Sequence, residues 1–158
     1  MLIVGLGNTI MGDDGIGVHV IRELEKFRPC GVELLEGGVS GIGLLSKLRG
    51  RKRVIIIDAV QGGGGEPGTI YRLTEKDLAR PEFKFFSLHD LALEHVLALG
   101  RELFGREFPE EIVIYGVEIK EIRFGETLSE PVRRALSRLV EILREEMAEY
   151  VSGDTGSG

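Results

Sequence analysis

Residues 1–27 read MLIVGLGNTIMGDDGIGVHVIRELEKF, and this stretch decides the fold. The apolar run Leu2–Leu6 leads into Gly5-Leu6-Gly7, a pattern typical of a buried strand that feeds a tight turn. After the turn, apolar residues recur at helical spacing, which predicts a helix from about Asp14 to Phe27. The chain therefore opens with a strand, a glycine turn and a helix.

The rest of the chain continues this alternation. Ser129 is expected to cap the last helix, and Ser87-Leu88-His89-Asp90 has the form of a capping box before another. We expect an α/β fold: a single-domain three-layer sandwich with a twisted, mostly parallel sheet of about five strands flanked by helices. Residues 1–150 form this domain in our interpretation, and residues 151–158 a disordered tail. Further strands are expected near 32–35, 53–60, 69–73 and 112–119, and further helices near 42–48, 87–104 and 130–149.

Composition and charge narrow the class of protein. The net charge of −6 and the pI of about 5.2 disfavour a nucleic-acid partner. No apolar run reaches the roughly 18–20 residues that span a bilayer, so we expect no membrane insertion. The only cysteine, Cys30, cannot form an internal disulfide, and the first residues lack the basic region of a signal peptide. Together these features favour a cytoplasmic protein.

The turn after the first predicted strand contains part of a dinucleotide-binding motif. Gly5-x-Gly7 follows a strand, and Glu36 ends the next strand, where a ribose-binding acid would lie. However, Ile10 replaces the third glycine of the G-x-G-x-x-G motif. Asp13 and Asp14 also stand at the start of the helix, where their charges would repel a pyrophosphate. A nucleotide-binding module is therefore the weaker alternative.

Two acidic positions remain as candidates for chemistry. One acid of the Asp13–Asp14 pair suffices to cap the helix, which leaves the other free to point into a cleft. Spacing alone does not decide between them. Asp58 closes the apolar run VIIID (residues 54–58), at a strand end where ligands collect in wound sheets. The alternative for Asp58 is a cap on the next turn.

His89 is the third candidate. A place in the first turn of a helix disfavours the imidazolium and keeps the ring neutral, as a metal ligand must be. Two carboxylates and one imidazole from three different strand–helix junctions suit nickel, zinc, manganese or iron. We find no conventional nucleophile, because Gly38–Ile42 lacks the final glycine of G-x-S-x-G and Cys30 has no base nearby in sequence.

Five segments occur along the chain in an order that is informative: GLGNTIMGDDGIG (5–17), EGGVSG (36–41), IIIDAVQGGGGEPGTIYRL (55–73), SLHD (87–90) and GVEIKEIRFGETLSEPV (116–132). Together they resemble a known family, the hydrogenase maturation endopeptidases. The resemblance implies an α/β fold with a five-stranded sheet and a metal site at Asp14, Asp58 and His89, and so selects Asp14 over Asp13. One departure is Glu118-Ile119, where the family often has proline after the acid.

The resemblance implies a specific reaction. The expected substrate is the precursor of a nickel–iron hydrogenase large subunit, from which a short C-terminal extension is removed after nickel insertion. The nickel belongs to the precursor, although other divalent metals can occupy such a site, and Asp14 or Asp58 is the expected general base of an aspartic-type or metal-dependent endopeptidase. Near the site, Gly38, Ser40 and Gly41 are candidates for peptide binding. The alternatives are a metal-dependent peptidase for another precursor and a non-catalytic nucleotide- or metal-binding module.

Overall fold

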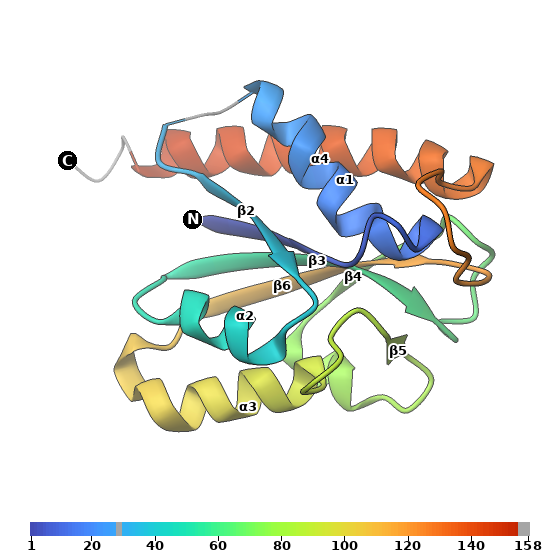
Figure 1. Cartoon of the computed structure of the whole chain (residues 1–158). Helices are drawn as coiled ribbons and strands as arrows, with labels where there is room; N and C mark the ends of the chain where they lie inside the picture. Colours follow the sequence, from blue (N-terminus) through green and yellow to red (C-terminus); the bar gives the residue numbers. More distant parts are fainter. Residues whose placement is uncertain (28–29, 155–158) are drawn as a thin grey trace.

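One mixed sheet forms the centre of the molecule (Figure 1). The computed structural model describes residues 1–27 and 30–154, and within them the sheet has six strands. The path of the sheet is β2-β1-β3-β6-β4, with β5 paired to β3. The first four of these run parallel, while β4 and β5 are antiparallel to their neighbours. The strands are β1 (Leu2–Leu6), β2 (Glu33–Gly38), β3 (Arg53–Gln61), β4 (Ile70–Leu73), β5 (Lys84–Phe85) and β6 (Glu111–Glu118).

Helices cover both faces of the sheet, which confirms the three-layer α/β prediction. The helices α1 and α4 lie on one face, and α2 and α3 on the other (Figure 1). The predicted five strands become six because β5, a two-residue strand, pairs with the end of β3. The α-helices are α1 (Ile16–Leu24), α2 (Gly41–Leu48), α3 (Leu93–Phe104) and α4 (Glu130–Asp154). Short 3-10 helices are η1 (Gly12–Gly15), η2 (Glu25–Phe27), η3 (Glu75–Ala79) and η4 (Gly105–Glu107).

The apolar run of β3 supplies both halves of the core. Successive side chains of a strand point to opposite faces of the sheet. Ile55 and Ile57 accordingly pack with α1 and α4, whereas Val54 and Ile56 pack with α2 and α3. All four side chains are fully buried. This explains why the run shows no alternation of polar and apolar residues, since a parallel strand in the middle layer is covered on both sides.

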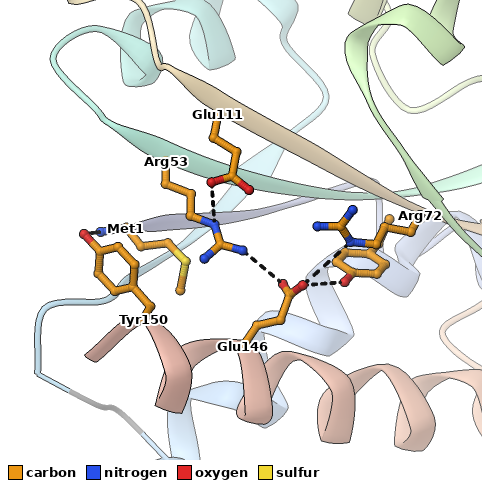
Figure 2. Close-up of polar contacts among 7 residues, drawn as sticks. Met1, Arg53, Arg72, Glu111, Glu146 and Tyr150 are labelled. Atoms are coloured by element: carbon orange, nitrogen blue, oxygen red, sulfur yellow. Dashed lines mark hydrogen bonds and ion pairs between the residues drawn. The ribbon is translucent and has the colours of Figure 1, made fainter. Parts of the chain in front are cut away.

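A polar cluster fixes α4 along the sheet (Figure 2). Tyr115 of β6 donates a hydrogen bond of 2.8 Å to Glu146 Oε1 on α4. Arg53 and Arg72 form ion pairs with the same carboxylate, at 3.9 and 3.8 Å. Because Glu146 is largely buried, it needs these partners, and they exist only at one position of α4 along the strands.

Three predicted boundaries are corrected. The helix expected from Asp14 to Phe27 is divided into η1, α1 and η2, and its α-helical part is Ile16–Leu24. Residues 151–154, expected to belong to the tail, are part of α4, which continues to Asp154; residues 155–158 lie outside the described part. The predicted capping box is also wrong, because α3 begins only at Leu93. Within the described ranges, no helix is both long and apolar enough to cross a membrane.

Candidate active site

Asp58 stands where the sheet opens at its carboxyl edge. The pairing of β1 with β3 ends at Gly5 and Ile57. Asp58 is therefore the first residue of β3 that has no partner in β1. Asp58 closes the apolar run but not the strand, because β3 continues to Gln61 along β6 and β5, one residue beyond the end predicted near residue 60. The strand thus supports Asp58 on one side while the other side is open to the loops that follow β1.

Glycines bring the turn after β1 close to Asp58. A Cβ atom on Gly17 would lie 2.5 Å from the carbonyl oxygens of both Leu6 and Ile57. Gly7 adopts a φ of +129°, and a Cβ there would lie 1.9 Å from the Asp14 carbonyl oxygen. No side chain fits at either position, so the glycines let η1 and α1 lie directly on the strands.

Ser87 joins the two carboxylates. Its hydroxyl lies 2.8 Å from Asp14 Oδ1 and is also hydrogen-bonded to Asp58 Oδ1. All three side chains are buried, with Asp58 and Ser87 fully excluded from solvent. The backbone N–H of Asn8 donates to Asp14 Oδ2 at 3.0 Å, and that of Ala59 to Asp58 Oδ1 at 2.8 Å. The result is an Asp14–Ser87–Asp58 bridge, with side chains drawn from three distant parts of the chain.

The surroundings of the bridge change the acidity of Asp58. Burial raises the pKa of Asp58 to about 8, and the nearby Asp14 adds to the rise, against the hydrogen bonds from Ser87 and Ala59. Asp58 Oδ2 has no hydrogen-bond partner among the described residues. A serine hydroxyl has one proton and donates to only one carboxylate at a time. With Asp58 protonated, Asp58 can donate to Ser87 and Ser87 to Asp14, so that both contacts are satisfied.

Asp13 has a different partner from Asp14. Its carboxylate accepts hydrogen bonds of 2.7 Å from both the backbone N–H and the hydroxyl of Ser129. Asp13 therefore ties η1 to the residue that precedes α4. The expectation that one of the two acids caps the following helix is wrong, because the N-cap position of α1 is Gly15 and no side chain caps it.

His89 lies in the loop between β5 and α3 rather than in a helix. Its side chain is exposed, and its backbone N–H donates to the Val39 carbonyl at 2.9 Å. Across residues 1–27 and 30–154, no three or more His, Cys, Asp or Glu side chains are grouped so as to hold a metal ion. The structure thus brings Asp14 and Asp58 together but leaves His89 outside that contact. A metal-binding role for the three residues stays a prediction.

The candidate peptide-binding residues have internal contacts of their own. Ser40 is the N-cap of α2 and accepts a 3.0 Å hydrogen bond from the Gly43 N–H. A Cβ atom on Gly41 would lie 2.8 Å from the Leu91 carbonyl oxygen, so this glycine allows two segments of the same chain to touch. Gly38 has a φ of +65° with open space beside it. Peptide binding at these positions stays a prediction.

Sequence reasoning missed Ser87 and Asp90. Both belong to SLHD, which was interpreted as a cap for its own helix, whereas their partners lie 29 to 73 residues away for Ser87 and 48 to 50 for Asp90. The N-cap residue of α3 is instead Ala92. The only signal in the sequence was a serine between apolar residues two positions before a candidate ligand.

A cavity of about 530 Å³ opens beside η1. Gly12 and Asp13 line one side of it, and residues of the β6–α4 loop line the other. Phe124 of that loop is 84% exposed. The cavity therefore provides room for an extended segment next to the residue that precedes Asp14.

Comparison with known proteins shows the class to which this fold and site belong. The structure superimposes on the NiFe hydrogenase maturation protease HybD from Thermococcus kodakarensis with a TM-score of 0.75, at 28% identity, covering 91% of this chain and 96% of that one. It matches the hydrogenase maturating endopeptidase HybD from Escherichia coli with a TM-score of 0.73, at 30% identity and 92% coverage of each chain. The fold is thus that of a group of peptidases.

The sequence comparisons identify the family. The family model described as hydrogenase maturation protease matches residues 18–146. The hydrogenase 2 maturation protease of Escherichia coli is 32% identical over 157 residues, which cover 96% of this chain and 94% of that protein. The chain belongs to the hydrogenase maturation protease family. The resemblance seen in the sequence, and with it the expectation of a peptidase, is confirmed.

Proposed function

We propose that this protein removes a short C-terminal extension from the precursor of a nickel–iron hydrogenase large subunit, once nickel has been inserted. The observation that carries the proposal is the buried Asp14–Ser87–Asp58 bridge at the carboxyl edge of the sheet. Wound α/β proteins place their active sites at this edge. Family membership supplies the class of reaction and the class of substrate.

In this proposal the nickel is part of the substrate. Carboxylate oxygens and an imidazole nitrogen are suitable ligands for nickel and for other divalent metals. Asp58 Oδ2 has no hydrogen-bond partner within the described chain, and the exposed imidazole of His89 is free to approach an arriving ion. Because the ion arrives already held by the precursor, Asp14, Asp58 and His89 need not form a complete site beforehand.

The two carboxylates suit peptide hydrolysis. One group must take a proton from the attacking water, and another must deliver one to the leaving amine. Burial raises the pKa of Asp58 in the absence of the ion, whereas an arriving nickel ion favours its carboxylate form, so either Asp14 or Asp58 can act as the general base. The substrate's nickel supplies Lewis-acid polarisation of the reacting groups. The cavity beside η1 is our candidate for the space that accepts the extension.

The test uses purified protein with nickel-loaded and nickel-free precursor, followed by mass spectrometry. We expect a C-terminal peptide to be lost from the loaded precursor only. Cleavage that ignores nickel would refute nickel recognition, and no cleavage of any cognate precursor would refute the function itself.

Variants then test the site. We expect Asp14→Asn, Asp58→Asn and His89→Ala to abolish cleavage while circular dichroism shows an intact fold. His95→Ala is a matched control, because His95 is an exposed histidine on α3. If His89→Ala cleaves as fast as His95→Ala, then His89 is not part of the site.

A further inference from the structure

The position of His89 is set by its backbone alone. The imidazole makes no hydrogen bond with any described residue, and the residues between Phe85 and Leu93 form neither helix nor strand. A segment of this kind is free to move unless other contacts hold it. A side chain that must meet a substrate in one geometry needs such support.

Three contacts hold the segment 87–90. Ser87 is joined to the buried carboxylates, and the His89 N–H is bonded to the Val39 carbonyl at 2.9 Å. The third contact is Asp90, whose carboxylate accepts from the N–H groups of Gly41 at 2.5 Å and Ile42 at 3.3 Å. The Ser40 hydroxyl lies 3.3 Å from the same carboxylate.

The contact of Asp90 is that of a helix cap supplied from outside the helix. The first N–H groups of a helix have no partner within it and favour a negative charge. At α2 the Ser40 side chain satisfies the N–H of Gly43, and Asp90 satisfies those of Gly41 and Ile42. The absence of a side chain at Gly41 allows this approach, because a Cβ there would collide with Leu91. The start of α2 is therefore built to receive the segment that carries His89.

We propose that Asp90 is a positioning residue that fastens the His89 segment to the start of α2 and so sets where the imidazole meets the substrate. The proposal rests on the function proposed above and assigns Asp90 a part in it. Asp90 acts through His89 and does not itself contact the precursor. It also couples the β2–α2 loop, with Gly38 and Ser40, to the position of His89.

The test compares Asp90→Ala with Asp77→Ala. Asp77 is the matched control, because it is another acidic cap, half-buried, and accepts hydrogen bonds from the N–H and hydroxyl of Thr74 at the start of η3. We expect Asp90→Ala to lower kcat/KM for precursor cleavage by about 10- to 100-fold, as small misplacements of a reacting group do. Asp77→Ala should cleave at the wild-type rate. Asp90→Asn keeps an oxygen for the Gly41 N–H and should recover most of the activity.

A further measurement separates positioning from other effects. By NMR, hydrogen exchange at the His89 amide should be at least about tenfold faster in Asp90→Ala than in wild type or Asp77→Ala. An unchanged exchange rate overturns the proposal. The exchange result stands even if no precursor is cleaved, so a failure of the proposed function is recognised separately.

Discussion

Asp58 is the residue whose environment has the clearest measurable consequence. Burial raises its pKa from 3.8 to about 8, so the folded protein holds a proton that the unfolded chain releases at lower pH. The stability that this protonated carboxyl contributes is fully present below pH 4. It is lost as the pH rises through about 8, which lowers the free energy of unfolding by an amount on the order of a few kcal/mol.

Thermal unfolding of wild type and Asp58→Asn between pH 4 and 9 measures this effect. The asparagine cannot ionise, so we expect the Tm of wild type to fall relative to that of the variant as the pH rises across this range. Two curves that stay parallel from pH 4 to 9 would contradict the raised pKa of Asp58.

The neighbouring acids Asp13 and Asp14 show what a sequence can and cannot reveal about single residues. They lie in η1, a 3-10 helix in which successive side chains point about 120° apart. Their partners, Ser129 and Ser87, are 116 and 73 residues away in the chain. No local pattern contains that information, so spacing left the two acids interchangeable. Only the family resemblance favoured Asp14, and the structure shows it in contact with Ser87, which also bonds Asp58.

At the scale of elements, the contact between α1 and the sheet explains the glycine-rich start of the chain. A Cβ on Gly17 would lie within 2.7 Å of three backbone atoms of Leu6 and Ile57. We therefore expect Gly17→Ala to push α1 and η1 away from β1 and to destabilise the protein by about 1–3 kcal/mol or more. Because η1 carries Asp14, precursor cleavage should fall as well.

Urea unfolding and the cleavage assay measure both effects. Gly153→Ala is the control, because Gly153 lies in α4 with open space around its Cβ position. That variant should be as stable as wild type or more so, since alanine favours helix over glycine. Equal stability of the two variants would show that α1 does not need the close approach.

The elements themselves could largely be predicted from periodicity. Apolar spacing predicts the strands and helices that alternate along the chain, because the side chains that form the apolar pattern of each element are the ones buried in the core. The exceptions are short or held by distant partners. Strand β5 has two residues and no pattern, and SLHD resembles a cap for α3 although its Asp90 caps α2. Local rules fail in that segment because its hydrogen bonds are made with other loops.

At the scale of the whole molecule, carboxylates join the loops at the carboxyl edge of the sheet. Asp90 connects the β5–α3 loop to α2, and Asp14 and Asp58 are both joined to the same loop through Ser87. Asp13 connects η1 to the start of α4. These contacts link both covering layers of the sandwich, so the site depends on the packing of the entire domain.

A comparison of Asp13→Ala with Asp14→Ala distinguishes an acid that stabilises this edge of the sheet from an acid that takes part in the reaction. Loss of Asp13 leaves the Ser129 N–H without its partner, which should cost about 1–3 kcal/mol of stability. Cleavage at a temperature well below unfolding should persist with a higher KM, because Asp13 lines the cavity proposed for the extension but its carboxylate is bonded to Ser129 rather than to Ser87. Loss of Asp14 leaves the Asn8 N–H and the Ser87 hydroxyl without this partner, so stability should fall by a comparable amount. Cleavage by Asp14→Ala, in contrast, should be abolished. The reverse pattern, with Asp14→Ala active and Asp13→Ala inactive, would move the reaction to the α4 side of η1.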